Sequence, residues 1–361
     1  MLIPGNVFNL YPEIKNDCNG EKMKHVIYYI IVIIIIIVLI PLLIVKGCSS
    51  TPQEEAPPKK KVESIKVKVY ISSEDRIQEM DLEEYVKCVV AAEMPADFEL
   101  EALKAQAVAA RTYVYARMKK IYTPKDDSHK DADICTDHTH CQAWISRQDA
   151  MKKWGIFKAN NNWKKVERAV AETEGTIIIH DGKIVNPVFH SSSGGKTENS
   201  EDVWEGVEVS YLRSVPSAGE EVAPNYIYTV TMKNEEFIEA VKKEYPDVIF
   251  EKENILEEIE ILGHTEGGDV KTIRIGNIEM KGTDLRKILS LRSANFEIEA
   301  LGDDSVKITT IGYGHGVGMS QWGANHLAKI GGNYEEIIKY YYSGVELTTI
   351  ENYDKKNATA Q

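Results

Sequence analysis

Residues 26–45 form an uninterrupted apolar run, VIYYIIVIIIIIVLIPLLIV, which lies between Lys24 and Lys46 and contains no charged side chain. Twenty helical residues with a rise of about 1.5 Å each extend about 30 Å, the thickness of the hydrocarbon core of a bilayer. A buried core helix of such length and uniformity is rare. The apolar part of a signal peptide is shorter, and no small-residue cleavage site follows this run. The sequence therefore predicts one uncleaved helix that spans a membrane.

The composition around this run divides the rest of the chain. Residues 1–25 form a polar tail that is too short to fold alone, and residues 46–64 are rich in proline, serine and charge, as in a flexible linker. We expect one folded region at residues 65–350 and a C-terminal tail at residues 351–361. Lysines occur on both sides of the apolar run, so charge asymmetry does not decide which side faces the cytoplasm.

The overall charge argues against one class of partner. The chain has 56 acidic and 43 basic side chains, a formal net charge of −13, and it contains no long basic run. A protein that binds nucleic acid normally presents clustered basic side chains to the phosphates. We therefore expect no nucleic-acid partner. The acidity by itself identifies no ligand.

Hydrophobic periodicity predicts an α+β fold after residue 64. The segment IKVKVYI (residues 65–71) alternates as a strand does, and a helix of residues 100–118 contains alanines that permit a close approach to a neighbour. From residue 176 strand-like segments dominate, with helical patterns at residues 234–243 and 283–289 and Ser320 placed to cap a late helix. This pattern predicts helices with a mixed, mainly antiparallel sheet.

Glu93 stands out on the first helix of this region. Asp81 and Glu84 fit a capping box at its start, and Glu93 continues the apolar stripe formed by Leu82, Tyr85, Val86, Val89 and Val90. A carboxyl group on a face turned toward the core has a raised pKa, as a general acid near neutral pH requires. The alternative is a structural glutamate at a frayed helix end, exposed to solvent or paired with Arg111 or Arg117.

A second group of reactive side chains is HKDADICTDHTHC, which holds His129, Cys135, His138, His140 and Cys141. Thiolates and imidazoles packed this closely suit tetrahedral zinc. Cys135 and Cys141 could instead form a disulfide in an oxidising compartment. Zinc with four protein ligands would be structural, because catalytic zinc keeps an open coordination position.

Two polar loops are candidates for binding a sugar. HSSSGGKTENSEDVW (residues 190–204) combines hydroxyl groups with two glycines, yet it contains neither the elbow of a serine hydrolase nor a P-loop. GYGHGVGMSQWGANHLA (residues 312–328) repeats glycine at every second position from 312 to 318, so its backbone must turn tightly or admit something closely. Its His315, Gln321 and Trp322 could line a sugar site. An ordinary turn and a packed glycine loop are the structural alternatives.

These segments together resemble the SpoIID/LytB family. The resemblance is carried, in the family's order, by residues 89–117 (VVAAEMPADFELEALKAQAVAARTYVYAR), 133–144 (DICTDHTHCQAW), 190–204, 291–298 (LRSANFEI) and 312–324 (GYGHGVGMSQWGA). It covers most of residues 65–350, and the first, third and last segments are long and specific.

The resemblance implies a lytic transglycosylase that cuts the bond between N-acetylmuramic acid and N-acetylglucosamine in peptidoglycan. The glutamate of the family's A-A-E-M-P motif falls on Glu93, which would act as the single catalytic acid and base. A structural Zn²⁺ is expected on His129, Cys135, His140 and Cys141, with His138 the doubtful member. The candidate substrate-binding residues are Gln142, Ser192, Ser193, Gly194, Tyr211 and Gln321.

The resemblance also implies a setting. The substrate would be glycan strands stripped of stem peptides by a partner amidase or endopeptidase during forespore engulfment, in a complex that includes a membrane partner. Residues 1–25 would then be cytoplasmic, and the rest would face the intermembrane space from the mother-cell membrane. Two other classes stay open, a non-catalytic glycan-binding enhancer of a partner amidase and a catalytic zinc amidase.

Overall fold

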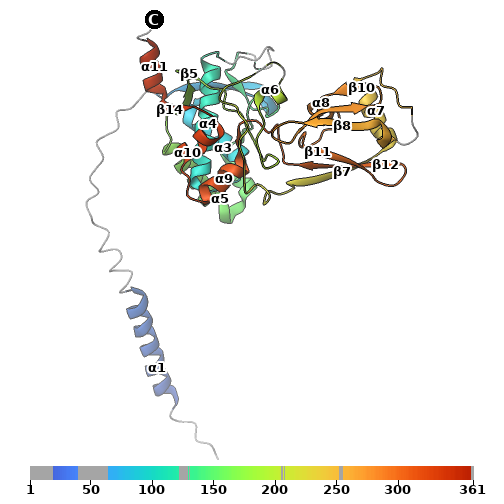
Figure 1. Cartoon of the computed structure of the whole chain (residues 1–361). Helices are drawn as coiled ribbons and strands as arrows, with labels where there is room; N and C mark the ends of the chain where they lie inside the picture. Colours follow the sequence, from blue (N-terminus) through green and yellow to red (C-terminus); the bar gives the residue numbers. More distant parts are fainter. Residues whose placement is uncertain are drawn as a thin grey trace, which may run out of the picture. The chain divides into compact units, whose positions relative to one another are not determined.

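The computed structural model describes residues 19–39, 64–121, 129, 131–204, 206, 208–251 and 255–358. The chain separates into two compact units, Met1–Glu63 and Ser64–Gln361 (Figure 1). Most of the linker predicted at residues 46–64 lies outside the described ranges, as do residues 1–18 of the predicted tail.

The first unit corrects the prediction of a membrane-spanning helix at residues 26–45. α1 (Asn19–Ile34) starts within the charged segment before the apolar run and passes into a π-helical turn, η1 (Ile35–Leu39). Only residues 26–34 of α1 belong to the apolar run, and residues 40–45 of the predicted span lie outside the described ranges. No helix within the described ranges is long and apolar enough to cross a membrane. The predicted single-pass anchor is therefore wrong, and so is the localisation in the mother-cell membrane that depended on it.

The second unit opens with a small sheet that leads directly into a helix. β1 (Lys66–Ile71) pairs antiparallel with β2 (Arg76–Asp81) and parallel with β3 (Ile134–Cys135). α3 (Leu82–Glu93) follows β2 at once because the Asp81 side chain accepts hydrogen bonds from the backbone N–H groups of Glu83 and Glu84. The predicted N-cap is thus confirmed. The Glu84 side chain pairs with Lys87.

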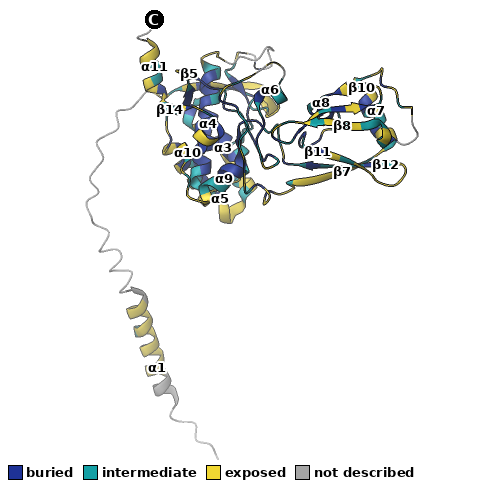
Figure 2. Ribbon diagram, viewed as in Figure 1, coloured by how far each residue is buried: buried dark blue, intermediate teal, exposed yellow. Residues whose placement is uncertain are grey.

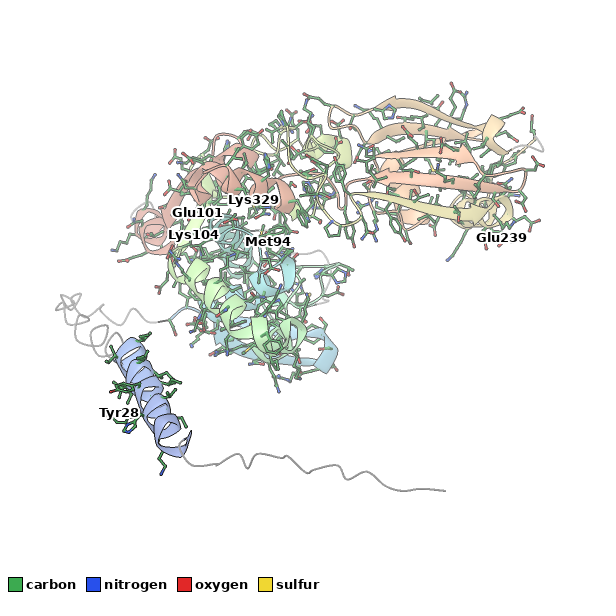
Figure 3. The ribbon with its side chains drawn as sticks, turned by 90° about the horizontal axis from the view of Figure 1, so that it is seen from below. Tyr28, Met94, Glu101, Lys104, Glu239 and Lys329 are labelled. Carbon is green, nitrogen blue, oxygen red and sulfur yellow. The ribbon has the colours of Figure 1, made fainter. Side chains whose placement is uncertain are left out.

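The central helix of this unit is α4 (Leu100–Met118), which has the predicted bounds. It is buried almost all round (Figure 2), and it packs against α3, α5, α9, α10 and β4. Its alanines at 102, 105, 107, 109 and 110 are fully buried, so the expected close approach of neighbours is confirmed. At its start Lys104 pairs with Glu101, which lies beside it in Figure 3.

Further elements complete the hydrophobic core around α4. The long helix α5 (Arg147–Ala171) is kinked at Gly155, whose φ of 72° favours glycine. The other elements of this part are β4 (Thr176–His180), β5 (Lys183–Ile184), β6 (Phe189–His190), α6 (Ser200–Val203), β13 (Met319–Ser320), α9 (Gln321–Lys329), α10 (Tyr334–Tyr341), β14 (Glu346–Thr349) and α11 (Ile350–Ala358). β4 is the central strand between β14 and β5. Ser320 caps α9 by accepting a hydrogen bond from Gly323 N–H, as predicted.

Residues 227–311 form a lobe with a hydrophobic core of its own. It contains two three-stranded antiparallel sheets, of order β10-β9-β8 and β11-β12-β7. The elements are β7 (Ile227–Lys233), α7 (Asn234–Glu244), η3 (Ile255–Glu258), β8 (Ile259–His264), β9 (Val270–Ile275), β10 (Ile278–Met280), α8 (Gly282–Ile288), β11 (Phe296–Ala300) and β12 (Ser305–Ile311). Their core includes Phe237, Ile273 and Phe296. Figure 1 shows this lobe as a separate block beside the helical part.

The architecture confirms the predicted α+β class with mainly antiparallel sheets. The helical patterns at residues 234–243 and 283–289 correspond to α7 and α8. Hydrophobic periodicity did not predict α5, α10 or α11. α11 occupies the segment expected to be a C-terminal tail, and its Asp354 accepts a hydrogen bond of 2.7 Å from the Tyr115 hydroxyl.

Candidate functional site

Glu93 is the last residue of α3 and the end of its buried stripe. Leu82, Tyr85, Val86, Val89 and Val90 are all buried, as the periodicity predicts. The chain leaves the helix at Met94, which is extended (φ −116°, ψ 144°) and is labelled in Figure 3. Since Glu93 is only half-buried, its carboxyl group stands between the core and the surface.

The surroundings of the Glu93 carboxyl group raise its pKa. Burial is the largest cause, because an ionised carboxylate loses its hydration there. Three weaker influences act in the opposite direction: a hydrogen bond from Ala143 N–H to Oε1 (2.8 Å), a hydrogen bond with the Gln321 side chain, and the charge of His138. The group is therefore held in place and still favours the protonated form more than a free glutamate does.

The structural alternative for Glu93, an ion pair with Arg111 or Arg117, does not form. The Arg111 guanidinium is fully buried and donates to both oxygens of Glu83, at 2.8 and 2.6 Å. Arg117 donates to the Tyr113 hydroxyl at 2.6 Å. The arginines that could have neutralised Glu93 are thus engaged elsewhere.

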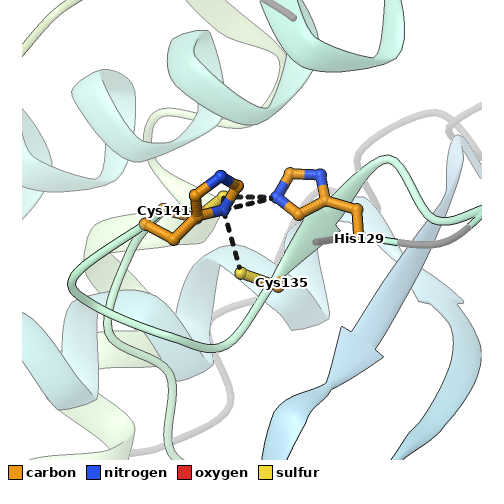
Figure 4. A group of neighbouring side chains, drawn as sticks. His129, Cys135 and Cys141 are labelled. Carbon is orange, nitrogen blue, oxygen red and sulfur yellow. Dashed lines mark hydrogen bonds between the residues drawn. The ribbon is translucent and has the colours of Figure 1, made fainter. Parts of the chain in front are cut away.

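The four side chains predicted to bind zinc converge. One ligand atom from each of His129, Cys135, His140 and Cys141 lies within 4.8 Å of all the others. His129 Nε2 is 2.8 Å from His140 Nδ1 and 3.0 Å from Cys141 Sγ, and Cys135 Sγ is 3.5 Å from His140 Nδ1. Figure 4 shows the labelled side chains pointing toward one another. Ligands at about 2.0–2.3 Å from a tetrahedral zinc have similar separations, so the residues fit a metal ion.

The chemistry of the two cysteines also suits a metal. Both are free thiols, so the disulfide that the sequence left open is not formed. A hydrogen bond from Cys141 lowers the pKa of Cys135 to about 5, and the same bond raises the pKa of Cys141, so the pair favours one thiolate, the form that metals bind. His138, the doubtful ligand, is exposed and does not belong to the cluster.

The loop that carries the cluster also reaches Glu93. β3 anchors its start through the pairing of Cys135 with Tyr70. At its other end, two residues after Cys141, the backbone N–H of Ala143 donates to Glu93. A metal bound by the cluster would therefore fix the loop that positions this N–H.

The serine loop, residues 190–195, is held by contacts on both sides. Ser192 exchanges two backbone hydrogen bonds with Tyr313, of 3.1 and 2.7 Å. The Ser193 hydroxyl lies 3.0 and 2.9 Å from the two oxygens of the fully buried Glu220 and donates to this carboxylate. Gly194 has the Asn295 side chain so close that an added Cβ would lie 2.3 Å from its Nδ2. A larger residue at position 194 would therefore require the Asn295 side chain to move.

The glycine loop, residues 312–318, connects the serine loop to Glu93. Gly312, Gly314, Gly316 and Gly318 all have positive φ, and a Cβ at Gly318 would lie 2.2 Å from the Val188 carbonyl oxygen. The chain then enters α9, where Trp322 N–H donates to the Ser191 carbonyl (3.1 Å). The preceding residue, Gln321, contacts Glu93, so α9 connects the serine loop to the carboxyl group through Ser191. Ser192, Ser193 and Gly194 line a small pocket together with Glu198 and Asp269.

All but one of the predicted substrate-binding residues are buried: Ser192, Ser193 and Gln321 are 2%, 4% and 6% exposed, and the same holds for the other two. Gln142 is 2% exposed, and its Oε1 lies 3.5 Å from the Tyr85 hydroxyl. Tyr211 is 8% exposed, accepts a hydrogen bond from Asn186 N–H and packs against His180. Their positions indicate support of the surrounding backbone, and a direct role in binding stays a prediction.

Sequence patterns did not reveal another site with buried carboxyl groups, the pair Glu198 and Asp269. Glu198 is 1% exposed, and its Oε1 accepts hydrogen bonds from Thr265 Oγ1 (2.8 Å) and Asp269 N–H (3.1 Å). Burial and the nearby Glu198 raise the pKa of Asp269 to about 8. Glu198 and Asp269 are 71 positions apart in the sequence, so only the tertiary structure brings them together.

Comparison with known proteins agrees with these motifs. A family model described as SpoIID, stage II sporulation protein, matches residues 70–180. The chain is 37% identical over 298 residues to stage II sporulation protein D of Bacillus amyloliquefaciens and 36% identical over 301 residues to that of Bacillus subtilis, in each case over 82% of both chains. It is also 27% identical over 313 residues to an amidase enhancer of Bacillus subtilis, over 73% of this chain and 40% of that protein.

The two stage II sporulation proteins are similar along most of their length, and the match includes the segments that carry Glu93 and the metal cluster. The predicted resemblance is therefore confirmed. This chain belongs to the SpoIID family of sporulation proteins.

Proposed function

We propose that the protein is a lytic transglycosylase of peptidoglycan, with residues 65–350 as its catalytic domain and Glu93 as its single acid and base. The observation that carries the proposal is the state of the Glu93 carboxyl group. It is half-buried, its pKa is raised by burial, and it is held by Ala143 N–H and Gln321. A carboxyl group whose pKa is raised by burial and that still reaches the surface suits proton transfer to a large substrate.

One carboxyl group is sufficient for this reaction. Protonated Glu93 gives its proton to the glycosidic oxygen as the bond from C1 of N-acetylmuramic acid to N-acetylglucosamine breaks. The resulting carboxylate takes the proton from the C6 hydroxyl of the same muramic acid, whose oxygen bonds to C1 and closes a 1,6-anhydro ring. Glu93 is then protonated again. No water enters, so the second carboxylate of ordinary glycosidases is not required.

The loops around Glu93 would bind the strand. The serine loop reaches the surface at Ser191, Gly194 and Gly195, its Ser191 carbonyl is bonded to Trp322 N–H next to Gln321, and Trp322 packs edge-on against Phe98 at a centroid distance of 4.7 Å. Amide, hydroxyl and aromatic groups together suit a sugar, which has both polar edges and apolar faces.

We further propose that His129, Cys135, His140 and Cys141 hold a structural Zn²⁺. Four protein ligands complete a tetrahedron and leave no position for a reactive water. The ion would supply rigidity to the loop that ends at Ala143 and hence to the N–H group that holds Glu93. This arrangement disfavours the zinc amidase among the classes considered.

Membership of a sporulation family supports a role in forespore engulfment, on glycan that a partner amidase has stripped of stem peptides. A second function has one observation in its favour, because a relative is named an amidase enhancer. In that case the chain would bind glycan and stimulate an amidase without cutting the strand itself.

Mass spectrometry of the products from amidase-treated peptidoglycan tests the proposal. The purified chain should release fragments that end in 1,6-anhydro-muramic acid, and the Glu93→Gln variant should release none. Reducing ends would indicate a hydrolase. No products, together with stimulation of an added amidase, would favour the enhancer.

A further inference from the structure

Arg292 is held between two tyrosine rings and has no acidic partner. Its guanidinium carbon lies 3.8 Å from the centroid of the Tyr228 ring and 5.2 Å from that of Tyr313. Stacking on aromatic faces orients the planar guanidinium and leaves its N–H groups free at the edge. The Arg292 side chain makes no ion pair or hydrogen bond to any residue that the structure describes. In a chain with a net charge of −13, an oriented arginine of this kind is available for an external anion.

The rings around Arg292 are also available. Tyr313 is 50% exposed and Tyr228 is 36% exposed. Tyr228 belongs to β7 and Tyr313 to the glycine loop, so an accessible surface of two aromatic rings and one cation extends from the lobe onto this loop. We call Tyr228, Arg292 and Tyr313 the tyrosine–arginine platform.

The platform adjoins the proposed substrate loops. Tyr313 exchanges both of its backbone hydrogen bonds with Ser192, and the carbonyl oxygen of Arg292 accepts one from Gly314 N–H (3.0 Å). Ser191, next to Ser192, is bonded to Trp322, which follows the Glu93 contact Gln321. A polymer bound at Glu93 and along the serine loop would therefore reach the platform with a sugar further along the strand.

The chemistry of the platform selects one feature of such a strand. An exposed aromatic ring stacks on the apolar face of a sugar, and a free guanidinium edge binds a carboxylate through two parallel hydrogen bonds. N-acetylglucosamine has no charged group. N-acetylmuramic acid carries a lactyl carboxyl group, which is anionic when free and neutral when an amide bond attaches the stem peptide.

We propose that Arg292 determines specificity by binding the free lactyl carboxylate of an N-acetylmuramic acid residue, with Tyr313 against the sugar ring. The platform would thereby favour strands whose stem peptides have been removed, at a position distinct from the reacting bond. The inference rests on the proposed action on peptidoglycan glycan.

Binding measurements on the full chain with Glu93→Gln, which prevents turnover, test this inference. The probes are a peptide-free glycan oligosaccharide with free lactyl carboxylates and the same oligosaccharide with each carboxylate converted to a primary amide. The free acid should bind about tenfold more tightly, as expected for a partly exposed charge-assisted pair. The preference should decrease at high salt.

Adding Arg292→Gln should remove the preference by weakening binding of the acid alone, and Arg292→Lys should retain part of it, because the charge persists without the planar fork. Arg274→Gln is the matched control, since Arg274 lies on β9 and pairs with Glu260. Equal binding of the two oligosaccharides by the parent would overturn the inference, as would an equal loss for both on Arg292→Gln, which indicates a structural role.

The outcome is separable from the proposed chemistry. If the unmodified chain releases no anhydro products and still prefers the free acid in an Arg292-dependent way, transglycosylation is refuted and the carboxylate site stands. If the chain releases them and binds the acid and the amide equally, the reverse holds.

Discussion

Burial raises the pKa of Glu93 and of both members of the Glu198–Asp269 pair, yet the two sites differ in how far they are exposed at the surface. Glu93 is half-buried at the end of a helix, whereas Glu198 and Asp269 are 1% and 8% exposed. In both places burial is the largest cause of the raised pKa. Loss of hydration alone therefore does not identify a catalytic group.

The contacts of the two sites indicate different roles. Glu93 is held by a loop N–H and by one glutamine, and it keeps access to the surface. Glu198 joins the serine-loop segment to Thr265 and Asp269 of the lobe. Because two neighbouring buried carboxyl groups ionise together only at high cost, the pair is best understood as a structural connection that retains a proton.

The largest expected effect separates the two sites directly. Glu93→Gln keeps the size of the side chain and cannot transfer a proton, so cleavage should fall by at least about 10³-fold, because general acid and base help is worth about 10²–10⁴-fold and one group serves both. Thermal unfolding should change little. The assay is release of anhydro fragments from peptide-free glycan.

Asp269→Asn is the control for this comparison, since it replaces another carboxyl group whose pKa is raised by burial. It should retain cleavage within a few-fold of the parent. Comparable turnover by Glu93→Gln, or complete loss on Asp269→Asn in a folded protein, would reverse the roles assigned to the two sites.

Removal of a candidate metal ligand should weaken the cleavage that depends on Glu93. Cys141→Ser should lower the zinc content from about one ion per chain, reduce thermal stability and weaken cleavage, because the loop that positions Ala143 N–H loses its anchor. Elemental analysis, thermal unfolding and the cleavage assay measure the three effects. Cys88→Ser is the matched control, as Cys88 is a buried free cysteine on α3 outside the cluster.

Two results would contradict this role of the metal. Protein without zinc but with the stability and activity of the parent would show that the cluster is not a metal site. A chelated protein that stays folded, loses all cleavage and regains it with zinc would indicate a catalytic ion.

The sequence predicted the parts of the fold that have a local signal. The stripe from Leu82 to Glu93, the alanines of α4 and the Ser320 cap depend on residues close in the chain, and each is confirmed. α5 was missed because Gly155 interrupts its periodicity and about half of its length is polar and exposed. The apolar run at residues 26–45 gave a strong signal for a membrane helix, and the structure does not contain one within its described ranges.

The candidate site was also predictable only in part, because only residues close together in the chain leave a local signal in the sequence. The four candidate metal ligands lie within thirteen residues, so their composition alone suggested them. Ala143 contributes a backbone N–H, which no side-chain pattern reveals. Glu198 and Asp269 meet across 71 positions, and the Arg292 platform joins three segments, so both required the tertiary structure.

A pH experiment sharpens the comparison with a smaller effect. The pKa of Asp269 is about 8 in the fold, against 3.8 for an ordinary aspartate. Between these values the unfolded chain has released a proton that the folded chain retains, so stability falls as pH rises. In Asp269→Asn this contribution is missing, and its melting temperature relative to the parent should rise from pH 4 to about pH 8.

Below the ordinary pKa, Asp269 is protonated in both the folded and the unfolded state. There the difference in melting temperature between the two proteins should no longer change with pH. Asp131→Asn is the control, because Asp131 is exposed. A difference between Asp269→Asn and the parent that does not vary with pH would show that Asp269 does not retain its proton.

The smallest effect is expected at Gln321, which acts on Glu93 through one hydrogen bond. This bond stabilises the carboxylate and lowers its pKa, against the larger opposite effect of burial. In Gln321→Leu the bond is lost, so the pKa of Glu93 should rise further. Since the reaction begins with protonated Glu93, the alkaline limb of the pH profile of kcat/KM should move to higher pH.

Gln142→Leu is the control for Gln321→Leu, because the Gln142 amide faces Tyr85; its alkaline limb should stay in place. If Gln321 only binds the glycan, KM should rise at every pH and the limb should not move. A shift to lower pH would mean that Gln321 accepts the proton of neutral Glu93 through its own oxygen. The direction of the shift therefore shows whether the Gln321 amide stabilises the carboxylate form of Glu93 or its neutral acid form. The position of the amide alone does not distinguish these two cases.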